Sequence, residues 1–109
     1  MIDILTNNFF HAINTKNEIL LGYILDENCI LDDYQQKAVL GKQKVINYLK
    51  NLYKEYTISI VNSVKDDQDT LLLAYKLNKG DENNFGSLVI RQNESKKIFF
   101  IKNVIINQN

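Results

Sequence analysis

Asn62 and Asn103 are the residues whose type and position best fit recognition of a small molecule. Each interrupts the apolar side of a stretch with strand-like alternation, Thr57–Lys65 for Asn62 and Lys97–Asn107 for Asn103. In a mostly apolar pocket, a few placed amides can orient a small polar or amphipathic ligand. Alternatively, each amide pairs with backbone at a bulge or a strand end. The sequence leaves both interpretations open.

Other reactive side chains occur singly or in unsuitable patterns. His11 lies beside the apolar stripe of the first predicted helix, and Cys29 next to Ile30 is typical of a buried small hydrophobe. One His and one Cys are too few ligands for zinc, and the acidic turn 66–69 lacks the spacing of a calcium loop. No Ser–His–Asp arrangement or phosphate-binding glycine loop is evident. We therefore expect no metal and no cofactor.

The composition is that of one ordinary globular domain spanning residues 1–109. Lys+Arg and Asp+Glu both total 13, and this zero net charge argues against a dedicated nucleic-acid surface. No apolar run approaches the roughly 20 residues that span a bilayer, so no membrane segment is expected. A single cysteine and an N-terminus unlike a secretory signal favour a cytoplasmic location.

Helical periodicity dominates the first half of the chain. A helix is predicted from Ile2 to Asn14, and a capping box at Thr15–Glu18 predicts a second helix that begins at Lys16. That helix should end at residues 26–28. Gly41 opens the strongest amphipathic pattern. The second helix is expected to bury these residues: Ile19, Leu20, Tyr23 and Ile24.

Strand-like alternation dominates the second half. Polar turn residues separate four runs, which predicts an antiparallel meander. The runs are Thr57–Lys65, Thr70–Lys79, Phe85–Gln92 and Lys97–Asn107. Two shorter runs, Cys29–Tyr34 and Lys37–Leu40, are expected to form a hairpin or an irregular strand pair before the third helix.

Both faces of the predicted meander are apolar, whereas a sheet with one wet face should show clean alternation. One face is predicted to pack on the helices and to hold Ile58, Ile60, Val64, Leu71, Leu73, Tyr75, Leu77, Leu88, Ile90, Phe99, Ile101 and Ile105. The other face would hold Val61, Leu72, Ala74, Val89, Ile98, Phe100, Val104 and Ile106. We expect this outer face to form a homodimer; the alternative is that strong sheet twist shields it.

The order of helix, helix, hairpin, helix and meander resembles the nuclear transport factor 2-like superfamily, with its SnoaL-like and ketosteroid-isomerase-like branches. Three stretches carry the resemblance: Phe9–Asn14, Asn28–Asp33 and Leu40–Leu49. The resemblance implies an α+β fold in which a cone-shaped, curved antiparallel sheet packs against about three N-terminal helices. The family uses this fold for isomerases, dehydratases, cyclases, hydrolases and binding modules, so the fold alone does not select the chemistry.

The resemblance also implies roles for three residues. It places Asp33 where the isomerases carry a general base, and a carboxylate in an apolar pocket can have a raised pKa and shuttle a proton. It places Phe9 where they carry the Tyr that stabilises the oxyanion, although Phe9 has no donor. Asn103 corresponds to their second oxyanion partner, as an amide instead of an acid. Alternatively, Asp33 caps backbone amides at a strand end, or it pairs with His11 as a SnoaL-like dyad.

Three functions follow as hypotheses. The first is a small-molecule-binding, SnoaL-like domain whose apolar pocket uses Phe9, Asn62 and Asn103 and need not catalyse a reaction. The second is an isomerase, dehydratase or cyclase with Asp33 as general base. The third is an adaptor that binds another protein through the outer sheet face or the basic face of the third helix.

Overall fold

The computed structural model describes residues 2–33 and 38–106, with the side chains of residues 3–33 and 38–103. The chain folds into an α+β structure of three helices and a curved six-stranded sheet. The elements are α1 (Ile2–Asn14), α2 (Glu18–Ile24), β1 (Leu25–Asp33), β2 (Val39–Leu40), α3 (Lys42–Leu52), β3 (Thr57–Asp67), β4 (Thr70–Lys79), β5 (Glu82–Gln92) and β6 (Ile98–Ile106).

The sheet has the strand order β2-β1-β6-β5-β4-β3. Strands β3 to β6 form the predicted antiparallel meander, and β1 with β2 forms the predicted hairpin. The predicted α+β fold, a curved sheet packed against three N-terminal helices, is confirmed. One strand pair departs from the antiparallel pattern, because β1 and β6 run parallel. Alternation in a sequence shows which face a residue occupies but not the direction in which a distant strand returns. The sheet is therefore mixed.

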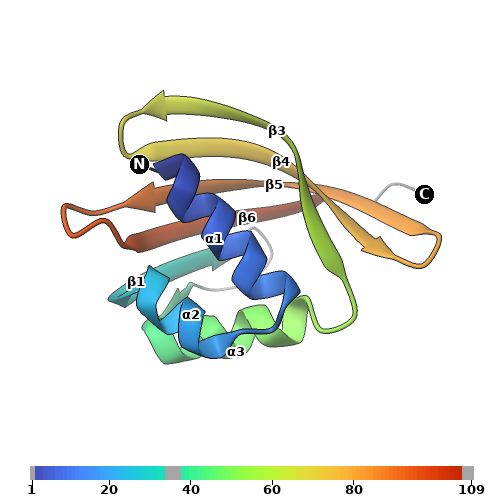
Figure 1. Cartoon of the computed structure of the whole chain (residues 1–109), viewed down its shortest axis with the longest axis horizontal. Coiled ribbons are helices and arrows are strands. Elements are labelled where there is room, and N and C mark those ends of the chain that lie inside the picture. Colours follow the sequence, from blue (N-terminus) through green and yellow to red (C-terminus); the bar gives the residue numbers. More distant parts are fainter. Residues whose placement is uncertain (1, 34–37, 107–109) are drawn as a thin grey trace.

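All three helices cover one face of the sheet, as Figure 1 shows. Helix α1 lies across the concave side of the strands, while α2 and α3 lie near β1. The apolar sides of the helices and strands meet there in one core that includes Phe9, Val45 and Ile101. None of the described helices lies on the opposite, outer face of the sheet.

Helix α2 differs from its prediction. It begins at Glu18, and Asn17 caps it by accepting a hydrogen bond from the backbone N–H of Leu20 at 3.0 Å. The proposed capping box does not form, because the Thr15 hydroxyl donates to the carbonyl of His11 in the preceding helix. Lys16, with a φ of 57°, lies in the left-handed region between the two helices and cannot start one.

The buried side of α2 also differs from the prediction. Ile24 is buried and Leu20 is partly buried, as predicted, whereas Ile19 and Tyr23 are 76% and 71% exposed and Leu21 is buried in their place. The helix ends before Leu25, which is the first residue of β1, so residues 26–28 belong to a strand.

A β-bulge in β3 reverses the alternation that the sequence suggested. Ile60 pairs with Tyr75 and Asn62 pairs with Ala74, so Val61 is an extra residue. Beyond the bulge, Val64 faces the outside and is 58% exposed. A second irregularity, between Arg91 and Gln92, lies opposite residues 98–100. There Ile98 is fully buried and Phe99 is 36% exposed, the reverse of the prediction.

Candidate functional site

Asp33 and Asn103 lie side by side on the inner face of the sheet. They form the last register pair of the parallel β1–β6 ladder, and both are buried, at 7% and 1% exposure. Each follows apolar strand residues whose side chains belong to the core, such as Leu31 and Ile101. The strands therefore place a carboxyl group and an amide next to each other at the end of an apolar stripe.

Tyr75 joins this pair from β4. Its hydroxyl donates a hydrogen bond to Asn103 Oδ1 at 2.7 Å, and both groups are buried. Tyr75 and Asn103 are separated by β5, in which Gly86 is the register partner of Tyr75. Because Gly86 has no side chain on the inner face, the Tyr75 ring can lean across β5 toward β6. Burial raises the pKa of Tyr75 to about 12.

Helix α3 contributes two further tyrosines. The half-buried Tyr48 donates a hydrogen bond from its hydroxyl to Asp33 Oδ2, and burial together with this bond raises the pKa of Tyr48. Tyr53, the residue at the C-terminal end of α3, is 1% exposed, and burial raises its pKa well above the usual value. All three phenols therefore keep their protons at neutral pH and can act as hydrogen-bond donors.

Two buried donors of this cluster have no hydrogen-bond partner among the described residues. They are the amide Nδ2 of Asn103 and the hydroxyl of Tyr53. Tyr53 and Tyr75 are close enough to affect each other's pKa, but their hydroxyls do not meet in normal hydrogen-bond geometry. A buried donor without an acceptor costs about 1–3 kcal/mol. An acceptor atom from a ligand would remove this cost.

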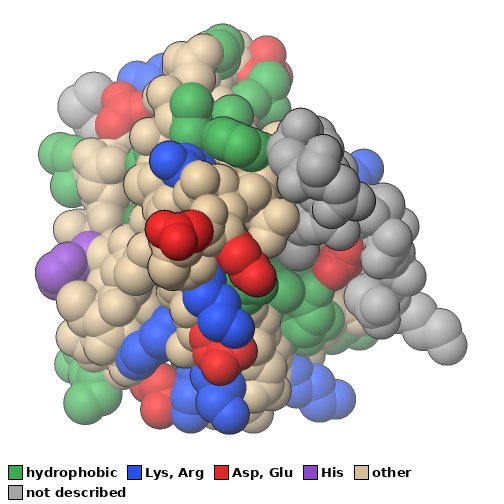
Figure 2. Space-filling model, turned by 90° about the vertical axis from the view of Figure 1, so that its right-hand side faces the viewer, with side chains coloured by type: hydrophobic (Ala, Val, Ile, Leu, Met, Phe, Trp, Pro, Cys, Tyr) green, Lys and Arg blue, Asp and Glu red, His purple; other side chains and the backbone are tan. Residues whose placement is uncertain are grey.

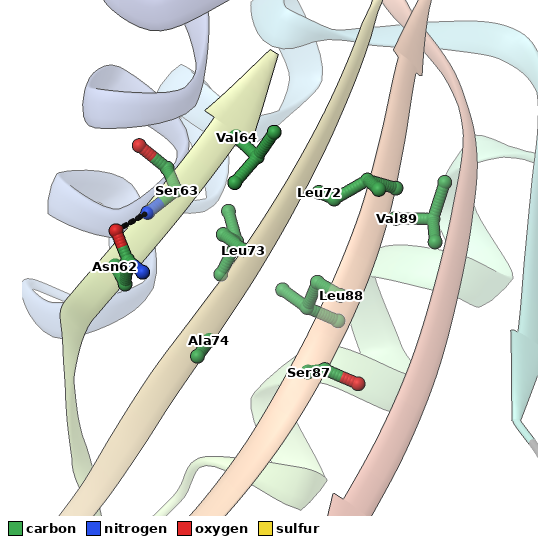
Figure 3. Close-up of a pocket in the computed structure, with 9 residues that line it drawn as sticks. All are labelled: Asn62, Ser63, Val64, Leu72, Leu73, Ala74, Ser87, Leu88 and Val89. Atoms are coloured by element: carbon green, nitrogen blue, oxygen red, sulfur yellow. Dashed lines mark hydrogen bonds between the residues drawn. The ribbon is translucent and has the colours of Figure 1, made fainter. Parts of the chain in front are cut away.

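The polar cluster consists of Asp33, Tyr48, Tyr53, Tyr75 and Asn103. A hollow of about 10 Å³ lies among the three helices, and its lining includes Ala12, Leu21 and Leu49. A second hollow of about 420 Å³ lies on the outer face of β3, β4 and β5 (Figure 3). Neither contains a residue of the polar cluster, so the expected apolar pocket inside the cone is not confirmed by them. The larger hollow lies on the opposite side of the sheet from the polar cluster.

The remaining predicted site residues are dispersed. Phe9 is fully buried in the core and packs edge-on against Phe10, with ring centroids 5.5 Å apart. The placement of Asn62 on the inner face is wrong, because the bulge at Val61 turns Asn62 to the outer face. There its Oδ1 accepts a hydrogen bond from the backbone N–H of Ser63. This is the backbone pairing at a bulge that was the alternative interpretation.

His11 and Cys29 agree with their sequence interpretation. His11 is exposed on α1 and Cys29 is fully buried. Burial, reinforced by the nearby charge of Asp26, raises the pKa of the Cys29 thiol to about 12, so the thiol is not a ready nucleophile. Among the described residues, no group of three or more His, Cys, Asp and Glu side chains could hold a metal ion.

Sequence reasoning missed the three tyrosines of the cluster. The sequence pattern places Tyr75 on the apolar inner face and Tyr48 within the stretch Leu40–Leu49, and it gives neither these two nor Tyr53 a role in a site. The sequence does contain a signal for such hydrogen bonds, because a buried Tyr normally finds a partner for its hydroxyl. Tyr75 in the run Leu71–Leu77 and Asn103 in the last strand are each the polar member of a buried stripe. Two polar side chains on the same buried face of a sheet suggest a mutual hydrogen bond.

Comparison with known proteins decides the fold family. No protein-family model and no curated protein matches the sequence. Solved structures do match. A ketosteroid-isomerase-like protein from Kribbella flavida matches 97% of this chain over 78% of its own, with a TM-score of 0.86 at 12% identity. The chain has the nuclear transport factor 2-like fold.

Two further structures with the nuclear transport factor 2-like fold cover this chain almost completely. A protein of the SnoaL-like family from Agrobacterium tumefaciens has a TM-score of 0.78 at 15% identity and covers 94% of both chains. A nuclear transport factor 2-like protein of unknown function from Cytophaga hutchinsonii has a TM-score of 0.74 at 17% identity, covering 93% of this chain and 86% of its own. At such identities, the likeness establishes the fold and not the activity.

The surface of this domain is mixed in charge. On the face shown in Figure 2, lysine and arginine side chains are interspersed with aspartate and glutamate. None of the described helices is both long and apolar enough to cross a membrane.

Proposed function

We propose that this protein binds a small, largely apolar molecule whose hydrogen-bond acceptor reaches the polar cluster. The observation that carries the proposal is the pair of buried donors, Asn103 Nδ2 and the Tyr53 hydroxyl, which have no acceptor among the described residues. Buried polar groups in folded proteins are nearly always satisfied. A carbonyl oxygen is an acceptor that two such donors could share.

The apolar residues around the cluster favour a ligand that is apolar apart from its acceptor atom. Leu31, Leu88 and Ile101 are buried next to Asp33 and Asn103 in the strand registers. The cluster residue that is least buried is Tyr48, on the α3 side. We therefore propose that the ligand enters past Tyr48.

Proton transfer is the second candidate function, with Asp33 as general base. The observation that favours it is the buried position of Asp33, which is the register partner of Asn103 and so lies beside its donor amide. A base must lie within hydrogen-bond reach of the proton that it removes. A carbonyl oxygen held by Asn103 would bring the neighbouring C–H group toward Asp33. This arrangement suits removal of a proton next to a carbonyl group.

A test of binding can use 2-tetralone, a small apolar ketone with acidic C–H groups. Saturation-transfer NMR on the wild-type protein should detect binding. Asn103→Leu, which removes the donor at similar size, should weaken the affinity by about tenfold or more, since an unmade hydrogen bond costs about 1–3 kcal/mol. Asn62→Leu, the matched change on the outer face, should bind like the wild type. Absence of binding, or equal effects of the two variants, contradicts the proposal.

The same ketone tests whether Asp33 acts as a general base. In D₂O, the wild-type protein should accelerate incorporation of deuterium next to the carbonyl, and Asp33→Asn should abolish that acceleration while binding persists. If binding occurs without any exchange, the protein is a binding module and the second candidate function is wrong. If Asp33→Asn exchanges at the wild-type rate, Asp33 is not the base.

A further inference from the structure

The hollow of about 420 Å³ on the outer face of the sheet runs across β3, β4 and β5 (Figure 3). Its apolar side is a row of three side chains, because Leu72 is the register partner of both Val64 and Val89. The next row contains Ala74 and its partner Ser87, whose small side chains leave the surface hollowed. All of the lining residues are uncharged. The hollow therefore suits the hydrocarbon part of a ligand.

Two cations lie at the β6 end of the apolar row. Lys102 on β6 is the register partner of Val89, and Arg91 follows Val89 by two residues on the same face of β5. Both side chains are exposed, and the Arg91 guanidinium lies over the Phe100 ring, with its Cζ 5.8 Å from the ring centroid. Diagonal neighbours on one face of a sheet are about 7–8 Å apart. One carboxylate can therefore contact both cations.

These two cations form no ion pair with a carboxylate in the described part of the chain. The ion pairs there join Asp or Glu to other lysines. Asp32 on β1 is the second register partner of Lys102 but forms no ion pair with it. Two neighbouring positive charges repel each other. A bound anion would remove this repulsion and accept charge-assisted hydrogen bonds from both side chains.

We propose that the outer face binds a straight-chain fatty carboxylate, with its hydrocarbon chain in the hollow and its carboxylate between Arg91 and Lys102. β6 and β3 are three strand spacings apart, roughly 14 Å, which suits an extended chain of about ten carbons. Asp67 lies three residues beyond Val64 and disfavours an anion at the β3 end. This site is separate from the polar cluster on the inner face. A second copy of the chain on the outer face would compete with the carboxylate for the same surface.

Isothermal titration calorimetry with decanoate tests the proposal. The wild-type protein should bind decanoate, and each CH₂ group removed from the chain should weaken the affinity by up to about fourfold. Arg91→Gln combined with Lys102→Gln should weaken it by about threefold to tenfold. Lys44→Gln combined with Lys54→Gln is the matched control, because it removes two exposed charges on the α3 side of the molecule. This control should bind decanoate like the wild type.

A second pair of variants tests the position of the hydrocarbon chain. Ala74→Leu should weaken the affinity for decanoate at least tenfold, because leucine would fill the floor of the hollow. Ser95→Leu makes a similar change in the exposed turn before β6 and should have no effect on binding. Circular dichroism should show that all variants are folded. Absence of binding by the wild type, or equal effects within either pair of variants, overturns the proposal.

Two further measurements separate this site from the alternatives. Asn103→Leu should bind decanoate like the wild type, and loss of binding in a folded Asn103→Leu variant would place decanoate at the inner face and overturn the proposal. Sedimentation equilibrium in saturating decanoate should give the mass of one chain, 12.7 kDa. A dimer that persists in decanoate would mean that a second copy covers the hollow, which also overturns the proposal.

Discussion

Tyr75 and Asn103 make a 2.7 Å hydrogen bond in an interior that is otherwise mainly apolar. Such a bond requires both residues, because removal of one leaves the other as a buried unsatisfied group. The same reasoning explains why the cluster contains Asp33 next to Tyr48. At the scale of residues, the candidate site is a set of interdependent polar groups and not one catalytic side chain.

The raised tyrosine pKa values predict a loss of stability at high pH. The pKa of Tyr75 is about 12 in the folded protein and about 10 in an unfolded chain. Below pH 10 both states hold the proton and the stabilisation is complete. Between pH 10 and pH 12 the unfolded state loses its proton first, so the free energy of unfolding falls.

Urea unfolding at a series of alkaline pH values measures this effect. The midpoint should decrease as pH rises above 10, and Tyr75→Phe should show a smaller decrease. Tyr23→Phe, at a position 71% exposed, is the control and should follow the wild type. Equal pH dependence in all three proteins would mean that Tyr75 does not carry the effect.

At the scale of elements, Asn14 connects the end of α1 to the edge strand β3. Its Oδ1 accepts from the backbone N–H of Ile58 and its Nδ2 donates to the carbonyl of Ile58, both at 2.8 Å. The side chain thus satisfies backbone groups at the free edge of the sheet, which would otherwise be open to pairing. Sequence periodicity gave no indication of this contact between residues 44 positions apart.

Asn14→Ala should lower the free energy of unfolding by about 1–2 kcal/mol, because two hydrogen bonds of a partly buried backbone are lost. Asn14→Asp should be at least as harmful, since a carboxylate can accept from Ile58 N–H but faces the Ile58 carbonyl without a donor. Denaturant unfolding measures both. Asn51→Ala, at an exposed position of α3, should change stability little. Equal effects at positions 14 and 51 would contradict the role of Asn14.

Gly41 determines where α3 begins. Its φ is 95°, in the region that favours glycine, and its N–H donates to the carbonyl of Cys29 at 2.8 Å. A Cβ at position 41 would meet no atom within 4 Å, so any cost of adding one comes from the backbone conformation. The glycine therefore turns the chain from β2 into the helix.

Gly41→Ala should destabilise the protein by about 1 kcal/mol or more, because the left-handed region is unfavourable for alanine.

Gly22→Ala is expected to have the opposite effect on stability. Gly22 lies within α2, and a Cβ there also meets nothing within 4 Å. Alanine is the better helix former, so stability should rise by up to about 1 kcal/mol. Thermal unfolding of both variants checks the two signs, and the same sign for both would contradict this explanation.

At the scale of the whole molecule, the two faces of the sheet differ. The inner face is covered by the helices and holds the polar cluster, whereas the outer face carries the hollow of about 420 Å³. The binding site proposed at the polar cluster and the homodimer interface expected from the sequence would therefore lie on opposite sides of one sheet. Variants such as Val64→Lys and Asn103→Leu should separate the two properties.

A dimer in which association supports folding should show concentration-dependent stability. The midpoint of thermal unfolding should rise with protein concentration in the wild type, because the dimer is favoured by mass action. Val64→Lys should unfold at a midpoint that does not depend on concentration. Calorimetry over a wide concentration range measures this. A wild-type midpoint that is equally insensitive would contradict coupled association and folding.

Much of the fold could be predicted from local patterns. The bounds of α1 and β4, the start of α3 at Gly41 and the four-strand meander follow from periodicity and turn residues, which are properties of short segments. The positions of Asp33 and Asn103 on strands in the sheet were also accessible. The start of α2 was not, because Lys16 adopts a left-handed conformation that the capping-box pattern does not reveal.

The sequence by itself determined which segments are helices and strands and which residues are apolar enough to form the core. Only the tertiary structure decided that β1 runs parallel to β6, that a bulge turns Asn62 outward, and that three tyrosines meet Asp33 and Asn103. The reason is physical. Periodicity records the local backbone geometry of one segment, whereas strand direction, bulges and buried hydrogen bonds depend on contacts between segments that are distant in the chain.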